Sequence, residues 1–316
     1  MMSFFSLLLA LMLLAGCSVN GTPAEQDTGE NTLGSETGTV TEIPPAETND
    51  APEELPVIDA SGGYTVETEE VFAENQGNRI YGLLYRPVGV KGARPTVIYS
   101  HGFGSSYRSG DRYAQALASL GYLVYCFDFR GGSESSRSEG SNLEMSVFTE
   151  QSDLEAVMAM LQDRADVDSN NLFLLGASQG GMVSAMTAAD NQDAIAGAVL
   201  LYPAFVLVDD AMEQFDHIDE VPDSMYYLFM TVGRAYFENL FGYDVYAGIQ
   251  DYEKDVLIIH GDQDRVPLSY SERAVDVYPS AQLEVIPGAG HGFYGESFDL
   301  AMEYILEYLS SRLTSS

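Results

Sequence analysis

The chain has 316 residues, of which 46% are hydrophobic, so it can bury a large core as one large α/β domain or two smaller ones. It carries 48 acidic residues against 14 basic ones, a formal charge of -34. Because phosphate binding needs clustered Lys and Arg, this balance argues against a nucleic-acid partner and favours a soluble, self-repelling surface. Two cysteines, Cys17 and Cys126, do not make a disulfide framework in a chain this long, and Cys126, in the apolar run YLVYCFDF, is expected to be buried.

The N-terminus has the pattern of an export signal. Residues 3–16, SFFSLLLALMLLAG, are apolar throughout but short for a bilayer span, which is typical of a signal-peptide core. The run ends in LAGC, which resembles the lipobox of bacterial lipoproteins, although the preceding MM has no Lys or Arg. The resemblance implies that a signal peptide, residues 1–16, is removed before Cys17. The Cys17 thiol would then carry a lipid that anchors the protein to the outer face of the bacterial cell membrane. The alternative is an ordinary signal peptide with an incidental cysteine.

A polar, acidic segment follows the cysteine. From residue 18 to about residue 61 the chain consists mainly of Thr, Glu, Pro, Gly, Asn and Ser, with very few large apolar side chains. Such a segment cannot bury enough surface to offset its ordering entropy, so residues 17–61 are predicted to be a disordered linker. Its acidic residues repel one another and extend it, as suits a spacer between a membrane and a folded domain, residues 62–316.

From Tyr64 onward, segments with strand and helix patterns alternate. Two antiparallel edge strands are predicted at YTVETEEVFAE and NRIYGLLYRP. Short buried strands follow at PTVIYS, YLVYCFDF, NLFLLGA, IAGAVLLY, DVLIIH and QLEVIP. Helices are predicted near 113–120, 150–163, 178–189, 271–277 and 298–309. Continuous apolar strands alternating with helices predict an α/β fold with a mostly parallel, eight-stranded sheet covered on both faces. Ligands of such sheets bind at the carboxyl ends of the strands.

One serine stands at a sharp corner of this pattern. Ser178 lies between two glycines in GASQGG, directly after a predicted strand and at the start of a predicted helix. This is the context in which G-x-S-x-G forms a nucleophile elbow. Gly176 and Gly180 let the backbone crowd together, and the helix N-terminus presents N–H groups to developing negative charge. The alternative is a serine that merely caps the helix.

A serine hydroxyl is a poor nucleophile without a base, and the chain offers four histidines, His101, His217, His260 and His291. His260 closes the strand DVLIIH, where a structural role is expected. His291 follows the last strand in the glycine-rich loop IPGAGHGFYG and is the candidate base. Between Ser178 and His291, HGDQDRVP places two carboxylates directly after a strand. The order serine, acid, histidine is the one described for α/β-hydrolases.

The globular part resembles the α/β-hydrolases, in particular the bacterial cinnamoyl (feruloyl) esterases and related serine aminopeptidase-like and dipeptidyl-peptidase-like hydrolases. The resemblance rests on HGFGS, DFRG, GASQGG, HGDQD and GAGHGF in this order, and covers nearly all of residues 62–316. It implies that Ser178 is the nucleophile, His291 the base, and Asp264, the second carboxylate of the family's G-x-x-D pattern, the acid in preference to Asp262. Here GDQDRVP is one residue shorter than the family's G-x-x-D-x-x-V-P, so the turn that holds Asp264 is expected to be tighter.

The same resemblance extends to the oxyanion hole. HGF resembles the family's oxyanion loop, which implies that the backbone N–H groups of Phe103 and Gln179 stabilise the tetrahedral intermediate. After DFRG the chain has Ser133 where the family commonly has a glycine, and no chemistry is assigned to that loop. No His or Cys pair has metal-ligand spacing and no glycine loop follows a nucleotide-binding pattern, so the sequence predicts neither a metal nor a cofactor.

A long insertion, about 203–252, separates the sixth and seventh strands and exceeds an ordinary connection. It is rich in Tyr, Phe and Met. The resemblance implies a lid over the active site, and such side chains suit an apolar or aromatic acyl group. More than half of them are expected to form the lid's own core instead.

The leading interpretation is a secreted, membrane-anchored serine esterase that hydrolyses hydroxycinnamoyl (feruloyl) esters, small or linked to polysaccharide, through an acyl-enzyme. A serine peptidase or amidase on the same fold is an alternative, which would recognise a substrate amino terminus through acidic side chains near the lid. Those candidates are Asp209, Asp210, Asp216, Asp219 and Glu220. A general lipase-like acyl hydrolase is another alternative. A non-catalytic binding lipoprotein is the remote one, because the set of predicted catalytic groups is complete. The sequence does not indicate an oligomeric state.

Overall fold

The computed structural model describes residues 63–314. The predicted signal peptide, Cys17 and the acidic linker up to residue 61 lie outside the described residues. Within residues 63–314, no helix has both the length and the apolar character to cross a bilayer.

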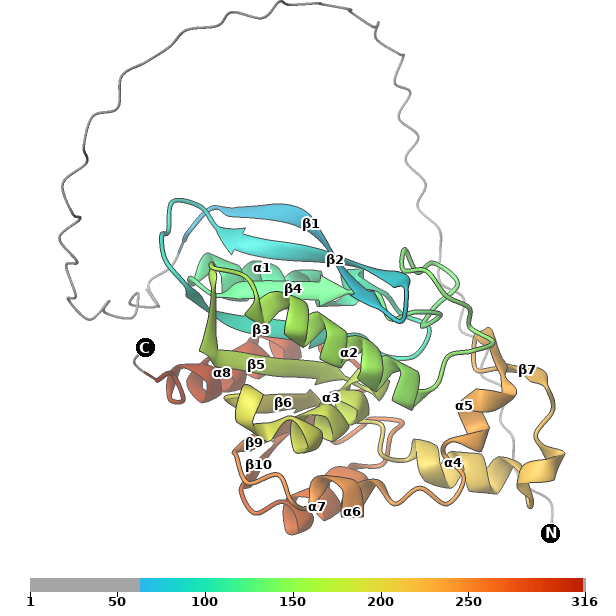
Figure 1. Cartoon of the computed structure of the whole chain (residues 1–316). Coiled ribbons are helices and arrows are strands. Elements are labelled where there is room, and N and C mark those ends of the chain that lie inside the picture. The colour runs from blue at the N-terminus through green and yellow to red at the C-terminus, as the bar shows by residue number, and fades with distance from the viewer. Residues whose placement is uncertain (1–62, 315–316) are drawn as a thin grey trace, which may run out of the picture. The chain divides into compact units, whose positions relative to one another are not determined.

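An eight-stranded sheet forms the centre of the described part (Figure 1). Its strand order is β1-β2-β4-β3-β5-β6-β9-β10, with β1 and β2 antiparallel to their neighbours and the remaining pairs parallel. The strands are β1 (Val66–Asn75), β2 (Asn78–Pro87), β3 (Arg94–Ser100), β4 (Leu123–Phe127), β5 (Val167–Ala177), β6 (Gly197–Leu201), β9 (Val256–Gly261) and β10 (Ala281–Ile286). The fold class predicted from the sequence, a mostly parallel eight-stranded α/β sheet, is confirmed.

Helices cover both faces of the sheet. They are α1 (Asp111–Ser119), α2 (Val147–Gln162), α3 (Gln179–Asp190), α7 (Leu268–Val277) and α8 (Glu296–Ser310). Helices α2 and α3 bury their apolar side chains against one face, and α1 and α8 bury theirs against the other. Strands β3, β4, β6 and β9 are buried along their whole length because both faces are covered, which explains their continuous apolar sequences. Cys126 on β4 is fully buried, as expected.

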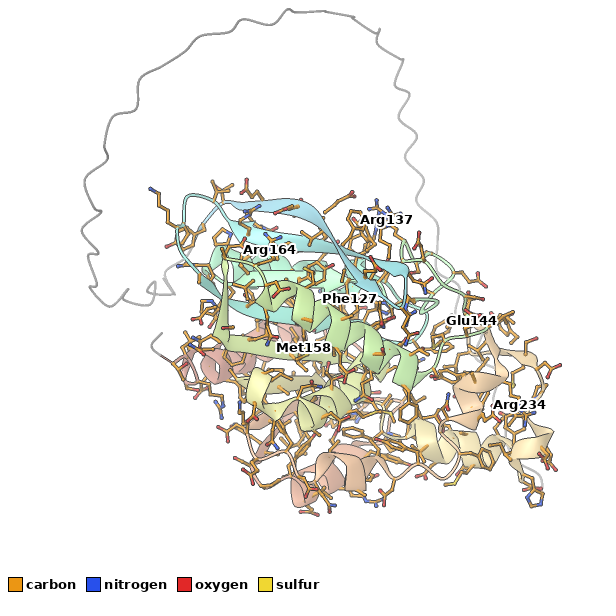
Figure 2. The ribbon with its side chains drawn as sticks, viewed as in Figure 1. Phe127, Arg137, Glu144, Met158, Arg164 and Arg234 are labelled. Atoms are coloured by element: carbon orange, nitrogen blue, oxygen red, sulfur yellow. The ribbon has the colours of Figure 1, made fainter. Side chains whose placement is uncertain are left out.

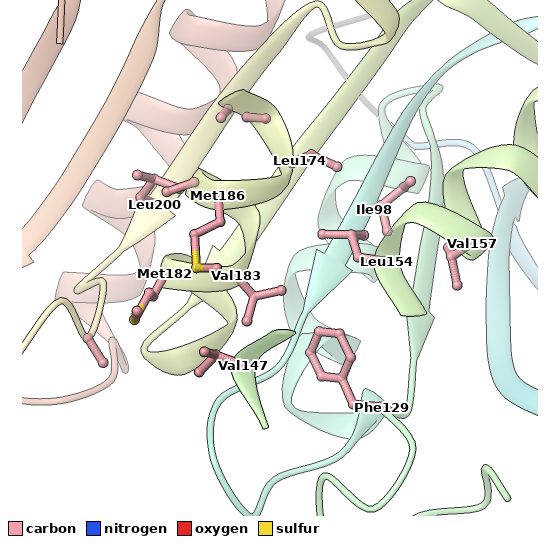
Figure 3. Packing of buried hydrophobic residues seen from close by; sticks show 14 of the residues in the cluster. Ile98, Phe129, Val147, Leu154, Val157, Leu174, Met182, Val183, Met186 and Leu200 are labelled. Atoms are coloured by element: carbon pink, nitrogen blue, oxygen red, sulfur yellow. The ribbon is translucent and has the colours of Figure 1, made fainter. Parts of the chain in front are cut away.

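The packing under α2 and α3 fixes the helix that follows Ser178. Leu154 of α2 and Met182 and Met186 of α3 lie over Ile98 and Leu174 of the sheet (Figure 3). Helix α2 begins at a reciprocal cap, in which the Ser146 hydroxyl accepts from the Thr149 N–H and the Thr149 hydroxyl accepts from the Ser146 N–H. Both helices therefore have a fixed position relative to the carboxyl end of β5.

The insertion between β6 and β9 is built from short elements. These are α4 (Leu207–Gln214), β7 (Ser224–Tyr227), β8 (Met230–Gly233), α5 (Arg234–Glu238) and α6 (Val245–Ile249), with β7 and β8 paired as a two-stranded sheet. Arg234, labelled in Figure 2, donates to the carbonyl oxygens of Ile218 (2.9 Å) and Val221 (2.5 Å) and so ties α5 to the preceding loop. Most aromatic side chains of the insertion are buried or partly buried, but they pack in the same apolar cluster as α2 and α3 and do not form a separate core of the insertion: Phe205, Phe215, Tyr227, Tyr236, Phe237, Tyr243 and Tyr246.

Candidate active site

The turn from β5 into α3 places a serine in a strained conformation. Ser178 has φ 55° and ψ −118°, a region that side chains other than glycine rarely adopt. The turn is crowded: a Cβ at Gly180 would lie 2.2 Å from the carbonyl oxygen of Ser100, and one at Gly176 would lie 2.2 Å from that of Gly180. The flanking glycines are thus required by close backbone contacts, and the Ser178 hydroxyl projects from the tip of the turn, where it lines a cavity.

His291 and Asp264 reach this hydroxyl from two separate loops. His291 Nε2 lies 3.0 Å from Ser178 Oγ, and Nδ1 lies 2.8 Å and 3.1 Å from the two Asp264 oxygens. With Nδ1 donating to Asp264, Nε2 is left as an acceptor for the serine proton. The Asp264 side chain is fully buried, and its Oδ1 also accepts from the Val266 N–H at 2.8 Å. The structure brings Ser178, His291 and Asp264 together in one hydrogen-bonded chain.

The other carboxylate of the loop points elsewhere. Asp262 Oδ1 accepts from the Gly288 N–H at 2.6 Å and makes no contact with His291. His260 lies beneath the loop, fully buried, and contacts Ser271 Oγ (2.7 Å) and the Val266 carbonyl oxygen (3.0 Å). Burial lowers the pKa of His260, so the ring is neutral and supports the turn that holds Asp264.

Two unpaired backbone N–H groups face the same region. Phe103 follows β3 and Gln179 opens α3, and both line the cavity beside Ser178. Neither N–H has a hydrogen-bond acceptor within residues 63–314. Gly102 allows the approach of the two loops, because a Cβ there would lie 3.1 Å from Ser178 Cβ. An oxyanion that forms next to Ser178 can accept from both groups.

The cavity at this edge of the sheet measures about 560 Å³ and is lined by both aromatic and acidic side chains. Among the aromatic ones, the Phe103 ring lies 5.7 Å from the Tyr227 ring and 5.5 Å from the Phe229 ring. The lining also includes the carboxylates of Asp209, Asp210 and Glu213, together with Arg265 and Tyr270. Asp209 accepts from the Tyr270 hydroxyl at 2.6 Å. Burial, reinforced by Glu213 and Asp209, raises the pKa of Asp210 above its ordinary value.

The sequence identified only part of this lining. Of the five acidic candidates, Asp209 and Asp210 line the cavity, whereas Asp216, Asp219 and Glu220 are exposed and do not. Glu213 was not among the candidates, although it lies one helical turn after Asp209 and Asp210 and thus shares their face of α4. Arg265 and Tyr270 were also missed. Their nearness to the predicted acid, Asp264, was the available signal.

Tyr202, also missed, packs against the histidine. It has φ 38°, is the residue after β6, and its ring centroid lies 4.8 Å from that of His291. Phe293 lies 5.0 Å from the same tyrosine ring. The position of Tyr202 at a strand's carboxyl end was the signal that could have found it. Within residues 63–314, no three His, Cys, Asp or Glu side chains gather in a way that could hold a metal ion.

A serine at a strained strand–helix turn, followed in the chain by an aspartate and a histidine at the carboxyl edge of a mostly parallel sheet, defines the α/β-hydrolase arrangement. Comparison with known proteins agrees. The family described as "Serine aminopeptidase, S33" matches residues 91–219. The structure of Est1E from Butyrivibrio proteoclasticus with ferulic acid bound superposes with a TM-score of 0.70 at 23% identity, covering 77% of this chain and 98% of that one. The described part of the chain has the α/β-hydrolase fold.

Several curated proteins match in sequence, among them two with named activities. A non-heme haloperoxidase of Rhodococcus erythropolis is 27% identical over 274 residues, which is 72% of this chain and 96% of the relative. The monoglyceride lipase of Mus musculus is 31% identical over 129 residues, 40% of each chain. These relatives are named for different reactions. Their similarity to this chain is consistent with the shared fold but does not identify the substrate, which has to be inferred from the site.

Proposed function

We propose that the protein is a serine esterase that hydrolyses carboxylic esters through an acyl-enzyme formed on Ser178. The observation that carries this proposal is the hydrogen-bonded chain from Asp264 through His291 to Ser178, next to two unpaired N–H groups. Each element that the chemistry needs is present: a nucleophile, a base in contact with it, a group that fixes the base, and donors for the oxyanion.

The reaction follows from these positions. Ser178 Oγ attacks the ester carbonyl carbon while its proton passes to His291 Nε2, and the oxyanion of the tetrahedral intermediate accepts from the N–H groups of Phe103 and Gln179. His291 returns the proton to the alcohol oxygen as the ester C–O bond breaks. A water molecule then attacks the acyl-enzyme, its proton passes through His291 back to Ser178 Oγ, and the carboxylic acid leaves. Asp264 stays ionised and stabilises the imidazolium in both steps.

The acyl group we propose is aromatic, of the hydroxycinnamoyl type. The wall formed by Phe103, Tyr227 and Phe229 offers ring faces and edges beside the nucleophile, and the cavity of about 560 Å³ has room for a phenylpropenoyl group. The structure of Est1E, which has the same fold, contains ferulic acid. The alcohol part can be small or part of a polysaccharide, since the proposed chemistry needs only the carbonyl and the leaving oxygen.

A second candidate is a peptidase or amidase. Asp209, Asp210 and Glu213 place three carboxylates on one wall of the cavity, where they can attract the ammonium group of a peptide amino terminus. The family match described as serine aminopeptidase is consistent with this reading. An amide differs from an ester in its leaving group: both leaving groups receive the proton from His291, but an amine is the poorer leaving group and is expelled only after its nitrogen is protonated.

Hydrolysis of methyl ferulate compared with that of an aminoacyl anilide separates the two candidates. The esterase proposal predicts that kcat/KM for methyl ferulate exceeds that for the anilide by at least about 100-fold, and that Ser178→Ala abolishes both. The matched variants Asp210→Asn and Glu213→Gln should leave methyl ferulate hydrolysis nearly unchanged. A preference for the anilide that these two variants remove would establish the peptidase instead.

We also propose that the protein is exported and lipid-anchored through Cys17, on the support of the LAGC pattern. Cys17→Ser should release the protein from the membrane fraction and eliminate incorporation of labelled fatty acid. A wild-type protein that is found outside the membrane fraction, with a mature N-terminus other than Cys17, would contradict this proposal.

A further inference from the structure

One side chain of the insertion contacts both residues whose N–H groups face the oxyanion. Tyr236, on α5, donates its hydroxyl hydrogen to Gln179 Oε1 at 2.8 Å. Its ring packs against the Phe103 ring, with the centroids 5.3 Å apart. Tyr236 is fully buried and does not line the cavity, so it cannot touch a substrate.

The Gln179 side chain is held on its other side as well. Its Nε2 donates to Glu150 Oε2 of α2 at 2.8 Å, and both side chains are at most 1% exposed. The second Glu150 oxygen is buried and has no hydrogen-bond partner within residues 63–314. The residue directly after the nucleophile therefore joins a buried carboxyl group on the main domain to a tyrosine of the insertion.

We propose that Tyr236 is a positioning residue, through which the insertion fixes the two backbone N–H groups of Phe103 and Gln179 that stabilise the oxyanion. This inference rests on the proposed esterase function. It gives the insertion a second task besides contact with the acyl group, because Tyr236 would affect every substrate alike, including esters too small to reach the aromatic wall.

The physical reason lies in how strongly oxyanion stabilisation depends on position. Donors contribute only when they lie 2.7–3.1 Å from the place where the oxyanion forms, and complete loss of one costs about 10²–10³ in kcat. Phe103 lies in a loop, and its N–H has no acceptor within residues 63–314. The peptide group that carries this N–H is held through the Gly102 carbonyl oxygen, which accepts from the Ser105 N–H at 3.1 Å and lies 2.8 Å from His101 Nδ1. The contacts of the Phe103 ring with Tyr236, Tyr227 and Phe229 add a further restraint on the same loop. Displacement of a donor is expected to cost less than its loss, about tenfold.

The test is Tyr236→Phe, which keeps the ring and removes the hydroxyl. For a short acetate ester, kcat should fall about tenfold with little change in KM. The inhibition constant of a trifluoromethyl ketone, whose hemiketal oxyanion occupies the same site, should rise by a similar factor. Tyr226→Phe is the matched control, because Tyr226 belongs to the same insertion, is 67% exposed and does not line the cavity. It should change neither quantity.

A second variant tests whether Tyr236 acts through the Gln179 side chain. Gln179→Met keeps the backbone N–H and removes the side-chain hydrogen bonds to Tyr236 and Glu150, so it should lower kcat at least as much as Tyr236→Phe. The double variant should be no slower than Gln179→Met, because both changes break the same connection. Additive losses would overturn the proposed route, and so would an unchanged kcat and inhibition constant in either folded single variant. A wild-type protein without ester hydrolysis would overturn the proposed function and this inference together.

Discussion

The carboxyl edge of the sheet and the insertion differ in structure and in the role we propose for each. Strands β3, β6 and β9 are buried at every residue, and the loops after β5 and β9 carry Ser178 and Asp264. The insertion consists of helices and strands of three to eight residues, and Tyr226 and Phe229 in it are 67% and 48% exposed. Groups that must react are thus placed at the ends of the most deeply buried strands. Groups that must fit a substrate are placed where short elements can accommodate it.

Tyr236 is the place where this division does not hold. It belongs to the insertion, yet it is fully buried and contacts the residues that follow β3 and β5. The insertion is therefore not a detachable cover, because its aromatic side chains continue the core under α2 and α3. The contrast between the two regions can be sharpened by four substitutions, two at the sheet edge, one in the insertion and one behind both.

The largest effect is expected at the nucleophile. Ser178→Ala removes the atom that forms the acyl-enzyme and should lower kcat by about 10⁶, by analogy with other serine hydrolases. Labelling by a fluorophosphonate probe should disappear while the circular dichroism spectrum stays native. A folded Ser178→Ala protein that is still labelled, at another serine, would show that the sheet edge does not hold the nucleophile.

The two carboxylates of the β9 loop should differ sharply. Asp264→Asn leaves His291 without its charged partner and should lower kcat by about 10⁴. Asp262→Asn serves as the matched control, because Asp262 only accepts from the Gly288 N–H and an amide oxygen can do the same. Its kcat should stay within about threefold of the wild type. The reverse order of the two losses, measured on one chromogenic ester, would refute the assignment of the acid.

In the insertion, removal of one aromatic wall residue should affect substrates unequally. Phe229→Ala takes away apolar contact, worth about 25 cal/mol for each Å² removed from water, and should lower kcat/KM for methyl ferulate about tenfold. The acetate ester of the same alcohol should lose much less. Tyr226→Ala, outside the cavity, controls for general effects on the insertion. Equal losses for both esters in Phe229→Ala would mean that this wall does not select the acyl group.

The smallest effect concerns Glu150, behind Gln179. Burial raises its pKa to about 8, Asp153 adds to the rise, and the Gln179 side chain opposes it. The native state thus keeps a proton that the unfolded chain loses above the ordinary carboxyl pKa of 4.5. The contribution of this proton to the free energy of unfolding is therefore complete below about pH 4.5 and is lost as the pH rises to about 8.

Glu150→Gln cannot titrate, so its melting temperature should gain on that of the wild type between pH 5 and pH 8, by about 3 °C for each kcal/mol. Asp153, whose pKa burial also raises, is present in both proteins and cancels in the comparison. Calorimetry at the two pH values measures the difference. If the difference in melting temperature between the two proteins is the same at pH 5 and at pH 8, the Glu150 carboxyl group of the native state is ionised at both pH values.

Local sequence patterns were sufficient for the fold. The central strands β3, β4, β6 and β9 could be predicted from continuous apolar runs, because burial on both faces leaves no polar side to the pattern. Ser178 could be placed at the elbow because a glycine lies two residues away on either side, between a predicted strand and a predicted helix. The sequence also offered both carboxylates of the β9 loop, and resemblance favoured Asp264. The hydrogen bond to His291 depends on a loop 27 residues further on.

The sequence alone determined which segments form strands, where the nucleophile elbow lies, and which few side chains can react. Each of these features is encoded in a segment of about ten residues. Only the tertiary structure decided that Glu213 joins Asp209 and Asp210 in the cavity, that Tyr202 packs on His291, and that Tyr236 reaches Gln179. These contacts join side chains of short elements whose sequences show no clear hydrophobic periodicity. Tyr236 and Gln179 are 57 residues apart in the chain. Their meeting depends on how the insertion packs as a whole, which no local pattern records.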